Sequence, residues 1–170
     1  MRQILDIIVC LCILLPVSLN GEIKQKQADE NYFKDYPEST TKIAPNGETV
    51  IVTDSKEQRV QVTFKALKNQ RNKLNDKKSN YKARCIPQYS IDIAVNEKKI
   101  VIPKDVFCDL HNLNRGKIII DGGKLVLILD GGDASTGYDV IIEFNQERVT
   151  RKREYFTCCD PQALLEDVIY

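Results

Sequence analysis

Opposite charges nearly cancel in this 170-residue chain, which has 25 Lys and Arg, 24 Asp and Glu and a formal net charge of +1. This balance excludes a whole-molecule field that would steer the protein to nucleic acid or to an anionic membrane. The length allows one domain of about 150 residues with a single apolar core, once an N-terminal export segment is set aside.

Residues 1–20 have the organisation of a secretory signal peptide. Arg2 precedes a continuous apolar run from Ile7 to Leu15, and Pro16-Val17-Ser18 supplies a small-residue step. The run is shorter than the roughly 20 apolar residues that cross a bilayer, so cleavage is favoured over an uncleaved membrane anchor. We therefore expect an exported chain, periplasmic or secreted, that begins at about Gly21 and has no membrane span.

The next segment, residues 21–47, is polar and charged, shows no periodic apolar face and closes on Pro45-Asn46-Gly47. This composition predicts a flexible polar leader. A single β-rich, disulfide-containing domain is expected to follow over residues 48–170.

Two strands are expected at the start of that domain. Glu48 to Thr53 is rich in β-branched residues, and Arg59 to Phe64 alternates between apolar and polar positions. The stretch 65–84 then carries many Lys and Arg residues against the single acid Asp76. It predicts a basic loop.

A hairpin is predicted around Asn96-Glu97. Apolar residues alternate through Ile91–Val95 and resume after the turn at Ile100. A two-residue loop would place Val95 directly opposite Lys98.

Extending the same register sets Cys85 opposite Cys108, which favours a disulfide between them in an oxidising compartment. Cys158 and Cys159 would then form a vicinal bridge, stay reduced or link two chains. A longer loop would shift the register, so a second connectivity is open. In it, Cys85 and Cys108 each pair with one of the two C-terminal cysteines and tie the tail to the sheet.

The second half of the chain predicts more strands and one helix. Ile118–Ile120 and Leu125–Leu129 are apolar runs around a glycine turn, typical of central strands covered on both faces. Tyr138–Phe144 alternates, and Arg148–Phe156 predicts an edge strand with an exposed basic face. Asp160-Pro161 and the apolar stripe after it predict a short C-terminal helix. The fold class expected is mainly β, an antiparallel sheet or small β-sandwich of about seven or eight strands with that helix.

The loop 131–137 contains the candidate binding residues Asp133, Ser135 and Thr136. Glycines and small hydroxyl residues can present backbone N–H groups to an anion. The loop fits neither phosphate-binding pattern, because no Lys precedes its hydroxyl residues and a strand follows its glycines. A hairpin connection with residues at positive φ is the simpler interpretation. The acidic positions around the loop lack calcium-loop spacing, so no metal or other cofactor is expected.

His111 is the single histidine, so any nucleophilic device would depend on it. Together with Asp133 or Ser135 it could serve an envelope hydrolase. Ser135 lacks the Gly-x-Ser-x-Gly surroundings of a nucleophile elbow, so this hydrolase is kept as the alternative and no catalytic residue is expected.

Two basic segments are candidates for a surface that binds an acidic partner. Their representative residues are Lys73, Lys77 and Lys78 in the loop and Arg151 and Arg153 in the strand. A solvated loop and a charge-protected sheet edge explain them more simply. No aromatic stacking pattern interleaves these charges, so no nucleic acid is expected as a partner.

The segment Gly131–Tyr138, the alternating strand after it and the turn into Arg148–Arg153 resemble a pattern in small uncharacterised exported proteins of Gram-negative bacteria. The resemblance covers residues 85 to 155. It implies a periplasmic setting and a β-rich fold, and it carries no activity to any residue.

We therefore expect an exported binding module, either an inhibitor or immunity-type protein or an envelope-associated protein that binds a partner. The partner expected is another exported or envelope protein. Besides the hydrolase, the alternative is a structural envelope component that oligomerises through Cys158-Cys159. The sequence defines neither the partner nor the oligomeric state.

Overall fold

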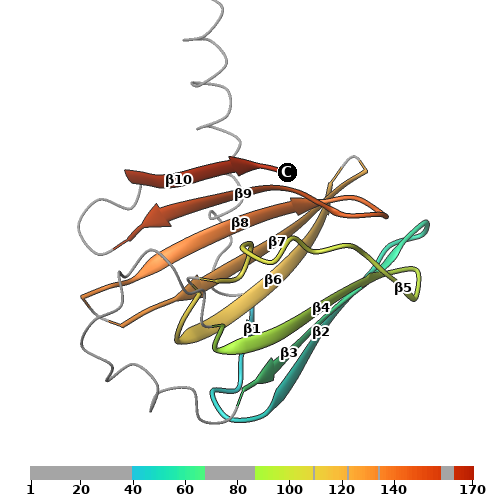
Figure 1. The fold of residues 1–170 in the computed structure, drawn as a ribbon. Helices are drawn as coiled ribbons and strands as arrows, with labels where there is room; N and C mark the ends of the chain where they lie inside the picture. Colours follow the sequence, from blue (N-terminus) through green and yellow to red (C-terminus); the bar gives the residue numbers. More distant parts are fainter. Residues whose placement is uncertain (1–39, 68–86, 109, 122, 134, 158–162) are drawn as a thin grey trace, which may run out of the picture. The chain divides into compact units, whose positions relative to one another are not determined.

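The computed structural model describes residues 40–67, 87–108, 110–121, 123–133, 135–157 and 163–170, all within the compact unit Thr40–Tyr170. These residues form ten strands in two antiparallel sheets (Figure 1). The mainly β class predicted from the alternating segments is confirmed, with more strands than expected. None of the described segments is helical, so none provides an apolar helix long enough to span a membrane.

The larger sheet has six strands in the order β1-β6-β7-β8-β9-β10. Their bounds are Thr41–Lys42 (β1), Leu113–Asp121 (β6), Lys124–Gly131 (β7), Tyr138–Phe144 (β8), Val149–Phe156 (β9) and Ala163–Ile169 (β10). From β6 onward each strand pairs with the next along the chain. The run Leu125–Leu129 in β7 is at most 1% exposed, which fits the central strand predicted from its continuous apolar residues.

The smaller sheet has four strands in the order β2-β3-β4-β5. Their bounds are Glu48–Asp54 (β2), Arg59–Ala66 (β3), Tyr89–Val95 (β4) and Lys98–Lys99 (β5). The predicted hairpin is confirmed: Val95 pairs with Lys98, and Asn96 and Glu97 have φ values of 50° and 68°. Two residues at positive φ give a tight turn whose twist matches that of the strands.

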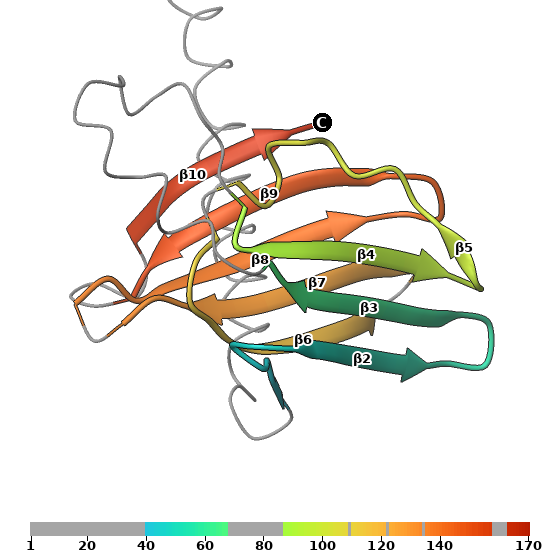
Figure 2. The ribbon, with the colours of Figure 1, turned by 60° about the horizontal axis from the view of Figure 1, so that its bottom comes forward.

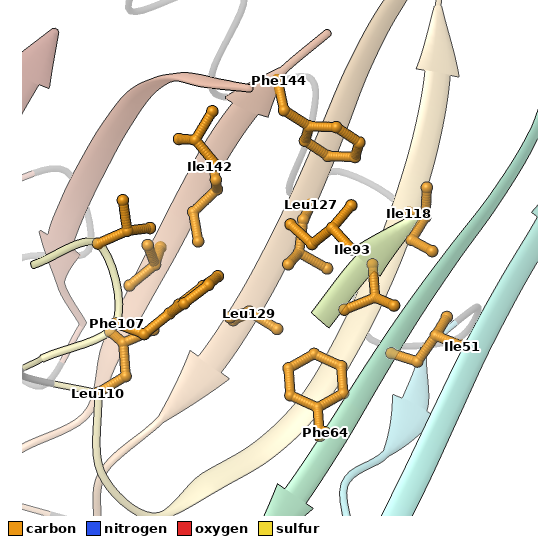
Figure 3. Packing of buried hydrophobic residues seen from close by; sticks show 14 of the residues in the cluster. Ile51, Phe64, Ile93, Phe107, Leu110, Ile118, Leu127, Leu129, Ile142 and Phe144 are labelled. Carbon is orange, nitrogen blue, oxygen red and sulfur yellow. The ribbon is translucent and has the colours of Figure 1, made fainter. Parts of the chain in front are cut away.

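The smaller sheet lies over part of one face of the larger sheet (Figure 2), and buried residues of both sheets form one apolar core. Figure 3 shows Phe64 and Ile93 of the smaller sheet beside Leu127 and Leu129 of the larger one. The Thr53 hydroxyl of β2 also donates a hydrogen bond to the Ile118 carbonyl of β6, 3.5 Å away. The two sheets therefore pack through their inner faces, as in the predicted sandwich.

The segment between β5 and β6 completes the core where the smaller sheet does not reach. Val106, Phe107 and Leu110 of this segment are buried, and Figure 3 shows Phe107 and Leu110 beneath Ile142. Its start is attached to β9, because the Val149 N–H donates a hydrogen bond to the Val101 carbonyl oxygen at 3.0 Å. We call residues 100–112 the covering segment.

The predicted C-terminal helix is wrong where the structure describes it, because Ala163–Ile169 is strand β10. Leu and Glu are good helix formers, but pairing with β9 determines the conformation here. Two of the bonds that hold β10 against β9 are Lys152 Nζ to Glu166 at 2.7 Å and Arg151 to Asp167 at 2.7 Å. The expected cap, Asp160-Pro161, lies outside the described residues.

The expected exposed basic face on residues 148–156 is also wrong. Strand β9 lies between β8 and β10, and Lys152 and Arg153 are each 1% exposed. Lys152 pairs in register with Ile142 and Arg153 with Ile141, so the two cations point to opposite faces of the sheet. Arg153 is ion-paired with Glu143 at 2.7 Å.

The end of the predicted leader, residues 21–47, is part of the described fold. Thr41 and Lys42 pair with Gly116 and Arg115 of β6, and Ile43 is 4% exposed in the core. Residues 41–43 therefore belong to the described fold. The sequence did not reveal this strand, because one isoleucine in a polar stretch gives no periodic signal.

The disulfide connectivity stays a prediction. Cys108 is disulfide-bonded, but no complete disulfide lies within the described residues, since Cys85, Cys158 and Cys159 are all outside them. The β4–β5 ladder ends at Lys99. The register therefore gives no direct measure of the expected Cys85–Cys108 pairing.

The buried ion pair on β9 can be tested against an exposed one. Arg153→Ala leaves Glu143 without this cation and is expected to lower the free energy of unfolding by about 3–5 kcal/mol. Arg59→Ala removes a pair with Asp54 whose side chains are 56% and 61% exposed, and should cost less than about 1 kcal/mol. Urea denaturation measures both, and equal losses would contradict the structural role of Arg153.

Candidate functional site

The predicted binding loop joins β7 to β8 beside the end of the covering segment. The Gly132 N–H donates to the carbonyl oxygens of His111 at 3.3 Å and Asn112 at 3.1 Å. The structure thus places the loop next to the backbone of the single histidine, a proximity that spacing in the sequence could not reveal.

Asp133 closes the loop on itself. Its Oδ1 accepts bonds from the backbone N–H groups of Ser135 at 3.0 Å and Thr136 at 3.1 Å. The same oxygen accepts the Ser135 hydroxyl at 2.9 Å and the Thr136 hydroxyl at 3.0 Å. These bonds to Ser135 and Thr136 hold the pKa of the exposed Asp133 carboxyl below its ordinary value. The N–H groups that an anion would need are therefore already used by the loop's own carboxylate.

The two glycines before Asp133 are required by packing. A side chain at Gly131 would overlap the ring of Tyr138. Gly132 has a φ of +86°, and a Cβ there would overlap the carbonyl oxygen of Thr136. The glycine pair is therefore explained by a tight hairpin connection beside a large aromatic ring.

Tyr138 attaches the loop to the covering segment. Its hydroxyl accepts the His111 N–H at 2.8 Å and donates to the His111 carbonyl at 2.6 Å. The two rings are 5.5 Å apart, and burial raises the pKa of Tyr138 well above its ordinary value. This role of Tyr138 is not evident from spacing along the chain, and its one signal in the sequence is a tyrosine directly after a glycine-rich loop.

The hydrolase alternative requires a serine activated by a base. The Ser135 hydroxyl donates to Asp133, and a carboxylate whose pKa is lowered is a weak general base. The structure therefore brings Asp133 and Ser135 together in the arrangement of a turn.

Two of the acidic residues around the loop, for which no metal was expected, lie on the face of the larger sheet that is turned away from the core. Asp130 of β7 and Asp139 of β8 are in register, and the Arg115 guanidinium contacts Asp130 at 2.7 Å. Burial, followed by the charge of Asp130, raises the pKa of Asp139 to about 6. Within the described ranges, His, Cys, Asp and Glu side chains form no group of three or more suited to a metal ion.

The expected basic surface is not assembled from the described residues. Lys73, Lys77 and Lys78 lie outside them. Arg153 is buried, and both Asp167 oxygens accept bonds from Arg151, at 2.8 and 2.7 Å. In this part of the chain the two arginines stabilise the sheet.

A hollow of about 350 Å³ lies beside β1 and β6 and is lined by Lys42, Ile43, Pro45, Leu113, Asn114 and Arg115. Two of its polar side chains have structural partners. Arg115 contacts Asp130 at 2.7 Å, and the Asn114 amide donates to the Gly132 carbonyl at 3.4 Å. The hollow therefore offers a ligand few polar groups.

Of the strands that the structure describes, β10 carries the most pronounced apolar exposure. Leu164, Leu165 and Ile169 are 51%, 57% and 78% exposed. The strand ends the order of the larger sheet, and no further strand follows it among the described residues. Exposed apolar side chains on a sheet edge are a feature of sites that bind another chain.

Comparison with known proteins finds no relative, since no family model, curated protein or solved structure matches the chain. Any functional conclusion therefore depends on the geometry described above.

Two alanine substitutions separate the clash at Gly132 from its backbone strain. Gly123 has the same φ of +86° but open space around its Cβ position, so Gly123→Ala should cost about 1–2 kcal/mol. Gly132→Ala adds overlap with Thr136 and should cost roughly 1–3 kcal/mol more. Thermal denaturation compares the two, and equal losses would show that the loop is not closely packed.

The raised pKa of Asp139 predicts a pH-dependent stability. Because folding strengthens proton binding by this group, its contribution is complete below about pH 4 and is lost as the pH rises through about 6. Asp139→Asn should therefore raise the free energy of unfolding at pH 7.5 by at most about 3 kcal/mol, and much less at pH 4. Asp121→Asn, at the exposed end of β6, is the control, and a gain that is independent of pH would contradict the assignment.

Proposed function

We propose that this chain is an exported binding module that recognises another exported or envelope protein and does not catalyse a reaction. The observation that carries this proposal is the concentration of exposed apolar side chains on the edge strand β10. Such side chains favour association with another chain.

Export is supported by the signal-peptide pattern of residues 1–20. A cysteine in a disulfide, Cys108, also fits an oxidising compartment. The resemblance to exported proteins of Gram-negative bacteria favours the periplasm.

The proposal includes no catalysis, because the candidate catalytic residues form hydrogen bonds that stabilise the fold. Asp133 and Ser135 bond to each other in a turn, and the backbone of His111 is held by Tyr138. No observation favours the envelope hydrolase over this structural use. The further alternative, a component linked through Cys158-Cys159, depends on residues outside those described.

Affinity capture tests the proposal. The mature chain from about Gly21 should retain a stoichiometric protein from native periplasmic extract, identified by mass spectrometry under non-reducing conditions. His111→Ala should retain the same protein, because His111 lies outside β10. Capture of no protein, together with hydrolysis of peptidoglycan or ester substrates that His111→Ala abolishes, would replace the binding module by the hydrolase.

A further inference from the structure

Strand β10 presents an open backbone edge. Figures 1 and 2 both show it at the margin of the larger sheet, with β9 on its inner side, and no other described strand pairs with it. An edge strand leaves half of its N–H and C=O groups free to form hydrogen bonds with another strand. The backbone of β10 can therefore extend the sheet by one strand.

The side chains of β10 protect this edge only through the charges of Glu166 and Asp167, which a basic partner strand can neutralise. Natural edges are commonly blocked by Lys or Pro, and Ala163–Ile169 contains neither. Leu164 and Ile169 pair in register with Tyr155 and Arg151 of β9. The irregularity between Leu164 and Glu166 leaves the register from Glu166 to Ile169 continuous. The edge thus combines exposed apolar residues with a regular end.

The charges of β10 are all acidic. Asp167 is bonded through both oxygens to Arg151. Glu166 is bonded through Oε2 to Lys152, yet its side chain is still 44% exposed. Glu166 is therefore the group on this strand that can attract a further cation.

This charge distribution disfavours a second copy of the chain as the occupant. Antiparallel pairing of β10 with itself would bring Glu166 and Asp167 of both copies into one short ladder. Like charges on facing strands destabilise pairing, whereas opposite charges stabilise it. A partner strand that carries a basic residue satisfies the edge better.

We propose that β10 binds an extended segment of its partner by strand addition, and that this segment alternates apolar residues with Lys or Arg, one of them opposite Glu166. The proposal rests on the binding function above and specifies the chemistry of the partner. Backbone hydrogen bonds would supply affinity, while Leu164, Ile169 and Glu166 would supply specificity.

The probe is a fluorescein-labelled eight-residue peptide of alternating valine and lysine, compared with a matched peptide of alternating valine and glutamate. Fluorescence anisotropy with the full chain at physiological ionic strength should show that the lysine peptide binds about tenfold more tightly, as expected for two or more favourable cross-strand pairs. Ile169→Lys should weaken binding of the lysine peptide by about tenfold as well. Glu166→Gln should remove most of the preference for lysine.

Val101→Lys is the matched control, because Val101 is an apolar residue that is 69% exposed and lies outside β10. It should bind the lysine peptide like the unaltered chain. Glu166→Gln can disturb Lys152, its buried partner. Ile169→Lys alters a side chain that is 78% exposed and should remain folded, so it tests the edge independently. Circular dichroism confirms this for each variant.

Three results would overturn the proposal. The first is equal binding of the two peptides, and the second is unchanged binding by Ile169→Lys. The third is a dimer of the chain, seen by analytical ultracentrifugation, that Ile169→Lys dissociates, since a second copy would then occupy the edge.

Capture from extract distinguishes failure of this proposal from failure of the binding function. If Ile169→Lys still captures the partner from extract, the binding function stands and its surface lies elsewhere. If no partner is captured although the lysine peptide binds, the binding function itself fails.

Discussion

Two adjacent cations inside strand β9 constrain the C-terminal third of this protein. Lys152 and Arg153 point to opposite faces of the sheet and are both 1% exposed, so each needs a carboxylate on its own face. Arg153 finds one on β8, and Lys152 is bonded to Glu154 of its own strand and to Glu166 of β10. Although burial opposes its charged form, the bonds from Glu166 and Glu154 keep the pKa of Lys152 above its ordinary value. Strand β10 is therefore part of the electrostatic balance of the sheet.

The need of polar and charged groups for partners also explains why the candidate catalytic and binding residues have structural roles. Asp133 could have been a ligand or a base, but it organises its own turn. Tyr138 is buried and holds the backbone of His111. Polar groups in a small β domain must be satisfied before they can act on anything else, and here the described loops and strands use them internally. Within the described strands, β10 leaves apolar side chains and a backbone edge exposed, and these are features that suit recognition of another chain.

The sequence predicted the strands whose signals are local. Alternation located β3, β4 and β8, β-branched residues located β2, and the Asn96-Glu97 turn gave the register of β4 and β5. It failed where partners distant along the chain decide the outcome. A helix was predicted for the C-terminal residues because the cations that pair with Glu166 and Asp167 lie on β9, which the local pattern does not show. Arg153 was predicted to be exposed because a strand pattern does not show which strands flank it. The loop of the candidate site could be predicted from its glycines and small polar residues. The bonds from Gly132 and Tyr138 to His111 could not, because they depend on tertiary packing.

The two sheets are unequal, with six strands against four, and the covering segment makes up the difference. Its described residues form one isolated bridge, between Val101 and Arg148, and no strand, so they lack the ladder of hydrogen bonds that secures a sheet. It is held instead at separate points, by Val101 near its start and by Tyr138 at His111. Between these points Val106, Phe107 and Leu110 are fixed mainly by packing in the core. The apolar interior is thus sealed least firmly beneath the covering segment, so partial opening of the domain should begin there while both sheets stay intact.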